Sequence, residues 1–228
     1  MPLGDFGGEL EPGIEVYFRN IERHILAKID EADYVFGCVA WLTHPEILRA
    51  LAKKRGVCIV VQKEDFLRPD VDVRKGWSSE LRKLYGALPS LDRFAFSLLG
   101  QLSVCGDPTL DAVRCVGNAN REKVPAWPRA HHKFVVFAKE YACPCDDCSR
   151  AALRGEHPPA EHQWKLTSVW TGSFNFTKNA AMSLENAVVL QSPKVVRAFY
   201  QEFQQVTAIS EPLDWESQWS EPEWRIGT

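Results

Sequence analysis

Apolar residues recur along the first part of the chain at two different spacings. Between Ile14 and Ile29 they lie three or four positions apart, which is the period of an amphipathic helix. The apolar runs at residues 34–41 and 57–61 are short and rich in β-branched or aromatic residues, as buried strands are. A predicted helix over residues 44–54, ending before Gly56, joins the two runs. The pattern therefore predicts an opening helix followed by a βαβ unit with parallel strands.

The rest of the chain alternates between strand and helix patterns, with one interruption. Over residues 88–129, Gly, Asp, Pro and Asn break the periodicity, and the apolar residues of 94–99 suggest a strand. Helices are predicted over residues 78–85 and 193–206, and strands over residues 133–137, 164–170 and 188–190. Strands that alternate with helices in this way indicate the α/β class.

Composition narrows the range of proteins to which the chain can belong. With 228 residues and 45% hydrophobic residues, the chain can bury one core, so we expect a single domain over residues 1–228. The formal charge of −3 gives no global basic field, and any polyanion would need a local patch. The sequence has no secretion signal and no apolar stretch of about 20 residues, so we expect a soluble, cytoplasmic protein without a membrane span.

Two strand ends carry residues suited to phosphate chemistry. His131 and Lys133 lie two apart at the start of a predicted strand, so both side chains share one face. Gly172, Ser173 and Asn175 follow the next predicted strand, in a turn whose N–H groups, hydroxyl and carboxamide can converge on phosphate oxygens.

A carboxylate follows these two segments. Glu185 comes ten residues after Asn175. We expect it to accept the Nδ1 proton of His131, which would fix the imidazole tautomer and leave Nε2 as a nucleophile.

These motifs together resemble the signature of the phospholipase D superfamily. The pattern His131-x-Lys133 is followed by the stretch TGSFNFTKNAAMSLENAVVL over residues 171–190, which is especially similar to the small bacterial nucleases and the mitochondrial Zucchini-type members. The resemblance implies an α/β/α sandwich around a mixed, largely parallel sheet. It also implies a metal-independent phosphodiesterase that needs no catalytic cofactor.

In the mechanism that the resemblance implies, His131 attacks phosphorus and forms a phosphohistidine. Lys133, Ser173 and Asn175 hold the phosphate oxygens together with the Gly172 turn. Members of the superfamily use two copies of the motif in one active site, whereas this sequence contains one. We therefore expect a homodimer in which His131 of the partner subunit protonates the leaving oxygen.

The resemblance favours an endonuclease acting on DNA or RNA, and two alternatives stay open. One is a phospholipase D or phosphatidyl transferase. The other is an inactive nucleic-acid-binding scaffold, because the family pattern usually has an Asp where this chain has Ala138. Asp146 and Asp147 are the acidic residues that could replace that Asp.

An insertion over residues 140–165 separates the two motifs, since Gly172 comes 39 positions after Lys133. It holds five metal-ligating side chains, namely Cys143, Cys145, Cys148, His157 and His162. Three cysteines and a histidine can bind zinc tetrahedrally and give a short loop a structural centre. Unligated reduced thiols and a disulfide are the other two interpretations.

The remaining cysteines and histidines favour structural roles. Cys38 and Cys58 fall within predicted strands and should pack in the core. His24 and His44 lie in or at the start of predicted helices. His132 should point to the opposite face of its strand from His131.

Overall fold

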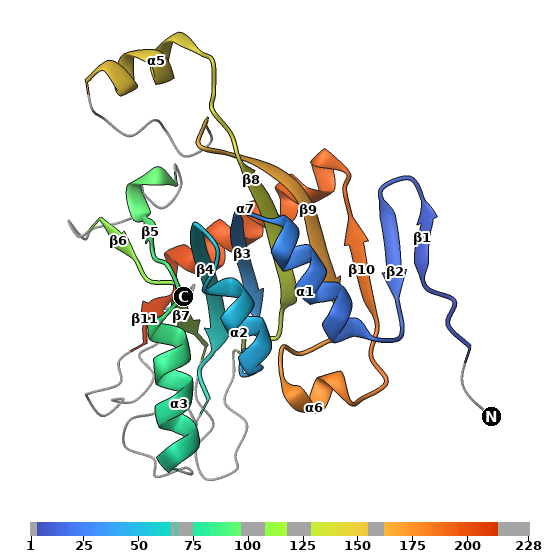
Figure 1. Cartoon of the computed structure of the whole chain (residues 1–228). Helices are drawn as coiled ribbons and strands as arrows, with labels where there is room; N and C mark the ends of the chain where they lie inside the picture. Colours follow the sequence, from blue (N-terminus) through green and yellow to red (C-terminus); the bar gives the residue numbers. More distant parts are fainter. Residues whose placement is uncertain are drawn as a thin grey trace.

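The computed structural model describes residues 4–64, 67, 75–96, 108–117, 129–154 and 162–213, and its main feature is one large twisted sheet (Figure 1). The strands of this sheet are β1 (Gly8–Glu11), β2 (Ile14–Tyr17), β3 (Tyr34–Val39), β4 (Gly56–Gln62), β7 (Val113–Val116), β8 (Lys133–Glu140), β9 (Trp164–Gly172), β10 (Ala187–Leu190) and β11 (Glu211–Pro212). The helices are α1 (Ile21–Glu31), α2 (Pro45–Leu51), α3 (Lys75–Gly86), α5 (Asp146–Leu153), α6 (Lys178–Ala181) and α7 (Pro193–Ala208). A short pair, β5 (Leu91–Asp92) and β6 (Thr109–Leu110), forms a second sheet beside it.

The strand order is β1-β2-β10-β9-β8-β3-β4-β7-β11. Strands β3 and β4 are parallel and joined through α2, which confirms the predicted βαβ unit, and β4 is also parallel to β7. The other neighbours are antiparallel. The mixed α/β sheet is confirmed, but the expectation of a largely parallel sheet was wrong, because β8, β9 and β10 run as a meander and β2 pairs antiparallel with its edge.

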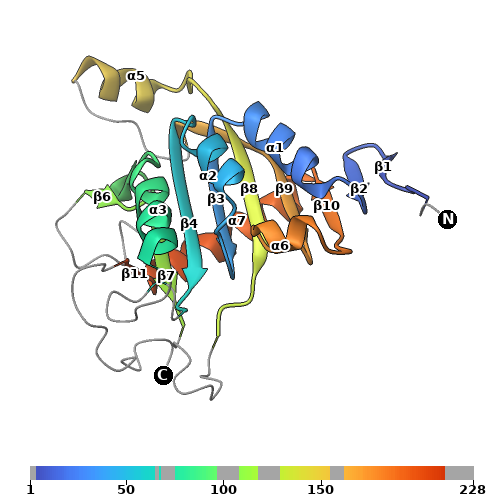
Figure 2. The same ribbon diagram turned by 60° about the horizontal axis from the view of Figure 1, so that its bottom comes forward.

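Helices cover both faces of the sheet, as the predicted α/β/α sandwich requires. Helices α1, α2 and α3 lie on one face and the long helix α7 lies on the other (Figures 1 and 2). Alternate residues of β8 divide between the two layers: Val135 and Phe137 pack toward the first group of helices, and Phe134 and Val136 pack toward α7. This alternation places His131 and Lys133 on the side of α1 and α2.

The predicted opening helix is partly wrong. Residues Ile14–Tyr17 form β2 and pair with β10, with Val16 opposite Val188. The helix α1 begins at Ile21, after Asn20 adopts a left-handed conformation with φ of 50°. The apolar spacing of Ile21, Ile25 and Ile29 is helical as expected, whereas cross-strand pairing determines the conformation of Ile14–Tyr17.

The other predicted helices and strands are confirmed within a few residues at their boundaries, with one further exception. The strand suggested over residues 94–99 is wrong at its start, where Arg93–Ala95 form a 3₁₀ turn. Leu98 and Leu99 lie outside the described residues.

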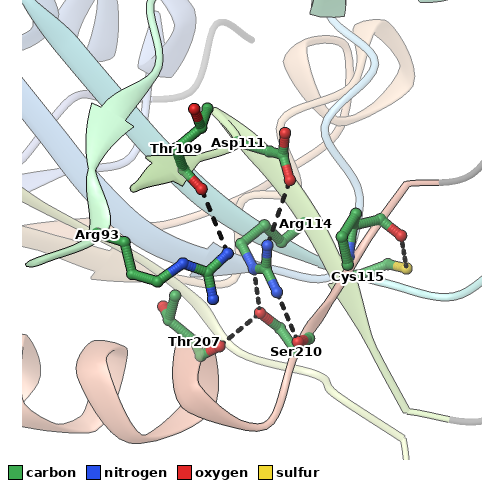
Figure 3. A network of polar contacts seen from close by, with 8 residues as sticks. Arg93, Thr109, Asp111, Arg114, Cys115, Thr207 and Ser210 are labelled. Atoms are coloured by element: carbon green, nitrogen blue, oxygen red, sulfur yellow. Dashed lines mark hydrogen bonds and ion pairs between the residues drawn. The ribbon is translucent and has the colours of Figure 1, made fainter. Parts of the chain in front are cut away.

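A buried arginine fastens the far edge of the sheet to the end of α7 (Figure 3). Arg114, on β7, donates through Nε to Ser210 Oγ at 2.7 Å and through a terminal nitrogen to the Ser210 carbonyl at 2.7 Å. Ser210 Oγ in turn donates to the Thr207 carbonyl, and Asp111 accepts from Arg114 at 3.3 Å. These bonds satisfy a guanidinium group that is only 3% exposed, as a buried charge requires.

Candidate active site

The two motifs meet at one edge of the sheet because β8 begins where β9 ends. In the antiparallel register Phe134 pairs with Thr171, and Lys133 pairs with Val39 at the end of β3. Gly172, the last residue of β9, pairs with Ala187, the first of β10. The turn that follows β9 also reaches the chain after β3, since Phe176 N donates to the Trp41 carbonyl at 3.1 Å. Four strand ends therefore surround the candidate site.

His131 and Lys133 are in direct contact. The Lys133 ammonium lies 3.2 Å from Nδ1 and 3.3 Å from Nε2 of the His131 ring, and 3.3 Å from the His131 carbonyl. Trp41 lies edge-on to the imidazole, with ring centroids 6.4 Å apart. An ammonium can only donate, so its partner nitrogen must be unprotonated, and the contact favours the neutral form of the imidazole.

The electrostatics agree with that geometry. Burial lowers the pKa of His131, and the neighbouring positive charges of Lys133 and Arg129 lower it further. Burial also lowers the pKa of Lys133, while the carboxylate of Glu185 acts in the opposite direction. The lowered pKa favours the unprotonated form of His131, which is the form that a nucleophile needs.

The carboxylate of Glu185 has a different partner from the one expected. It accepts a short hydrogen bond from Ser173 Oγ, and Ser173 Oγ accepts from Asn186 N at 3.0 Å. Among the described residues, no hydrogen bond joins Glu185 to His131, so the predicted tautomer-fixing bond is wrong for the single chain. The imidazole of His131 contacts the Lys133 ammonium instead. The carboxylate of Glu185 and the imidazole therefore have different partners.

The backbone of the turn is also used differently. The N–H groups of Ser173, Phe176 and Thr177 donate to the carbonyls of Asn186, Trp41 and Asn175 respectively, at 2.8–3.1 Å. These three groups are therefore not available to phosphate, contrary to the expectation of a backbone cradle. The buried Oδ1 of Asn175 has no hydrogen-bond partner among the described residues, but it is an acceptor, so only the amide nitrogen of this side chain could donate to phosphate.

Gly172 has a packing role that the sequence did not suggest. A Cβ atom at this position would lie 2.2 Å from the Asn186 carbonyl oxygen and 2.8 Å from Ala187 Cα. Only glycine lets β9 and the start of β10 approach this closely. The residue therefore helps to place Ser173 against Glu185.

A cleft of about 620 Å³ opens beside these groups. Its lining combines site residues with aromatic and basic ones: Trp41, Thr43, Pro45, Trp77, Asn175, Thr177, Lys178, Asn179, Ala180, Ser183 and Glu185. Trp77 is 40% exposed, and Lys178 opens α6 with an exposed side chain.

The sequence reasoning missed Trp41, Trp77 and the pair that supports Trp41. Glu64 accepts from Trp41 Nε1 at 3.1 Å and forms a close ion pair with Arg129, two residues before His131. Trp41 was recognised only as the end of an apolar run. The one available signal was that Trp41 follows the predicted strand that became β3, which pairs with β8 beside His131.

Ala138 lies deep in the sheet, fully buried, and belongs to the apolar cluster beneath α7. An Asp there would need a buried partner. Asp146 and Asp147 belong to α5, beyond the opposite end of β8, so they do not replace it at the site (Figure 1).

The other histidines have structural contacts, as expected. His24 stacks on Tyr17 with ring centroids 3.9 Å apart. His44 is 3% exposed, begins α2 and lies 3.4 Å from a Glu22 oxygen. His132 points to the α7 side, where Nε2 lies 3.5 Å from Glu202.

The inserted cysteines form a separate cluster. Cys143, Cys145, Cys148 and His162 have their ligand atoms within 4.8 Å of one another. His157 lies outside the described residues. Cys38 and Cys58 are buried within strands, as expected for packing residues.

Comparison with known proteins identifies the class. A family model described as "Cardiolipin synthase, PLD-like domain" matches residues 25–207, a span that contains His131, Lys133, Asn175 and Glu185. Since that span is most of the chain, the protein belongs to the phospholipase D superfamily. Membership supports a phosphodiesterase-type enzyme.

Individual relatives extend over most of the chain. An uncharacterized protein of Acanthamoeba polyphaga mimivirus is 31% identical over 220 residues, covering 90% of this chain and 68% of that protein. Nuc from Salmonella typhimurium is described as a phospholipase D family member. The match covers 87% of this chain and 95% of Nuc, at 20% identity and a TM-score of 0.48. The match with NucT from Helicobacter pylori covers 87% of this chain and 98% of NucT, at 13% identity and a TM-score of 0.47.

Among the described residues, no helix combines the length and the apolar character that crossing a bilayer requires.

Proposed function

We propose that the protein is an endonuclease that cleaves phosphodiester bonds of nucleic acid without a catalytic metal, through a phosphohistidine on His131. The observation that carries this proposal is the contact between His131 and Lys133 at 3.2 Å, at the edge where Ser173, Asn175 and Glu185 also gather. A neutral imidazole beside a fixed ammonium provides both a nucleophile and a charge for the phosphate oxygens.

In the first step, His131 attacks phosphorus and a P–N bond forms as the bond from phosphorus to the leaving oxygen breaks. The leaving oxygen takes a proton from His131 of the partner subunit, which begins the step as the protonated imidazolium and acts as general acid. Lys133 and the Asn175 carboxamide donate to the non-bridging oxygens, whose charge increases in the transition state.

In the second step, water attacks the phosphohistidine. The P–N bond breaks, the electron pair returns to the His131 nitrogen, and His131 of the partner subunit takes the proton of the attacking water. Both histidines then have their starting protonation states. The two steps therefore balance with water as the only co-reactant.

A shared site follows from the number of groups required. One imidazole must attack while another protonates, and the sequence contains one His-x-Lys motif. A two-fold axis through the cleft edge would place two copies of His131 on opposite sides of one phosphate. The absence of a Glu185–His131 bond within the chain fits this arrangement, because the carboxylate can then interact with groups supplied by the partner subunit.

Nucleic acid is the preferred substrate because of the cleft. Trp77 and Trp41 both line the cleft that also contains Asn175, and Lys178 adds a positive charge. Stacking on an aromatic side chain is how single-stranded nucleic acid is commonly held, at about 1–3 kcal/mol per base. The matching family model is described as cardiolipin synthase, so a phospholipid phosphodiester is the alternative substrate.

One assay separates these possibilities. Labelled single-stranded DNA, double-stranded DNA, RNA and a phosphatidylglycerol vesicle are each incubated with the wild-type chain and with His131→Ala, in EDTA. We expect cleavage of a nucleic acid by the wild type alone. Cleavage of the lipid alone would replace the nuclease proposal by a phospholipase. Nucleic-acid binding without cleavage by the wild type would indicate the inactive scaffold.

A further inference from the structure

The connection between β8 and β9 carries a cluster that the phosphodiesterase site does not use. His162 Nδ1 lies 3.1 Å from Cys148 Sγ and 3.3 Å from Cys145 Sγ. With Cys143, all four ligand atoms lie within 4.8 Å of one another. In tetrahedral zinc geometry, sulfur and nitrogen ligands lie about 3.6 Å apart and two sulfurs about 3.8 Å apart. The cluster therefore already has close to the dimensions of a zinc site.

The fold explains why His162 meets the three cysteines, although it follows Cys148 by 14 residues. Strands β8 and β9 stay paired to their ends, where Glu140 is opposite Trp164, and the Tyr141 N–H donates to the Gln163 carbonyl at 2.9 Å. His162 is therefore held across from the segment that holds Cys143. The first turn of α5 then brings Cys148 back over Cys145.

The inserted segment has little apolar surface to stabilise it. Of the described side chains in α5, Cys148 and Ala151 are buried, whereas Leu153 is 88% exposed. A helix of eight residues is marginal by itself in water. A metal that joins four ligands would supply the missing cross-link, as structural zinc does in small domains.

We propose that Cys143, Cys145, Cys148 and His162 bind one structural zinc ion that holds the end of the β8–β9 pair together with α5. The site lies beyond Glu140, seven residues along β8 from Lys133, or about 23 Å at the rise of a strand. That distance separates the ion from the phosphodiester chemistry. The assignment is independent of the proposed function.

The ligands define the test on the intact chain. Protein purified without chelator is analysed for metal by mass spectrometry, and zinc X-ray absorption reports the atoms around the ion. We expect about one zinc per chain with three sulfur and one nitrogen neighbours. A folded wild-type chain with less than about 0.1 zinc would overturn the proposal, whether its thiols were reduced or joined in a disulfide.

Variants assign the ion to these side chains. His162→Gln should lower the zinc content at least five-fold, whereas His162→Cys should keep it, since four thiolates also bind zinc. Arg150→Ala, on the exposed side of α5, is the matched control and should keep a full equivalent. Full zinc in His162→Gln would overturn the assignment. If His162→Gln does not fold, absorption spectra of His162→Cys must show four sulfur neighbours for the assignment to stand.

Discussion

The two ends of the β8–β9 pair contrast in how their functional groups are assembled. At the end near Lys133, the groups come from segments between residues 41 and 185, and four strand ends bring them together. At the end near Glu140, the ligands lie within 20 residues of one another, on one excursion of the chain. The first site depends on the whole sheet, and the second depends on one strand pair and a short helix.

The contrast teaches what each site can tolerate. Residues at the sheet edge are held by backbone pairing that the core also needs, so a side chain can be removed there without loss of the fold. The cysteine cluster has no such support, because its segment buries few side chains. We therefore expect chemistry to fail at one end and stability to fail at the other.

His131→Ala provides the strongest test of this contrast. It should lower cleavage at least about 10³-fold, since the attacking atom is lost, while the thermal midpoint and zinc content stay unchanged. Rates of product formation are measured beside a melting curve. His132→Ala is the matched control on the opposite face and should keep activity within a few fold. Wild-type-like rates in His131→Ala would eliminate His131 as nucleophile.

Removal of zinc should lower stability and leave cleavage nearly unchanged, the opposite of what His131→Ala does. A strong chelator should lower the thermal midpoint by about 4–8 °C, equivalent to about 2 kcal/mol for a chain of this size, because α5 and the strand ends lose their cross-link. Cleavage by the protein that stays folded should change less than two-fold. A loss of cleavage that precedes any change in the melting curve would mean that the metal participates in the chemistry.

Trp77→Ala tests whether the cleft beside the site binds bases. Loss of one stacked base should raise KM for a nucleic acid about ten-fold and leave kcat within about two-fold. Trp77→Phe should restore most of the affinity, since it keeps an aromatic face. Tyr141→Ala, at the zinc end of the same strands, is the control and should leave KM unchanged. An unchanged KM in Trp77→Ala would remove the stacking argument for nucleic acid.

Sequence reasoning was successful where the information is local. The period-two and period-3.6 patterns gave the βαβ unit and α7, and the spacing of Cys143, Cys145 and Cys148 identified the cluster. It failed where partners from distant segments decide the structure. Cross-strand pairing with β10 made Ile14–Tyr17 a strand, and the return of β8 beside β3 made the sheet mainly antiparallel.

The same limit applies within the candidate site. His131, Lys133, Asn175 and Glu185 were identified through motifs, but their hydrogen-bond partners could not be. Whether Glu185 bonds to His131 or to Ser173 depends on the turn after β9, which no local pattern specifies. Trp77 was missed because a single exposed aromatic residue on a helix has no signal until α3 packs beside the strand ends.

Mixing chains tests the proposed shared site. If both copies of His131 are needed, equal amounts of wild-type and His131→Ala chains, after exchange, give about a quarter of active dimers and about half inactive hybrids. Activity should then be about two-fold below that of simple dilution. Sedimentation at the assay concentration must show a dimer. A fully active monomer would contradict the shared site, and activity equal to dilution would show that each chain acts alone.

The smallest expected effect concerns the protonation of His131. Its pKa lies below the ordinary value, mainly through burial and then through the positive charge of Lys133. The neutral form is the nucleophile, so the acidic limb of kcat/KM should fall below about pH 6.5, and activity should be lost as the pH drops through the lowered pKa. Lys133→Met removes the positive charge of the lysine but keeps the burial of the imidazole. The His131 pKa, followed by NMR of the imidazole, should therefore rise and stay below its ordinary value.

Lys139→Met removes the same charge toward the zinc end of β8 and should leave that pKa where it is. An unchanged pKa in Lys133→Met would mean that burial alone keeps the imidazole neutral. The role of Lys133 would then be limited to holding the phosphate. Equal shifts in both variants would show that the whole strand, and not one end of it, sets the charge at the site.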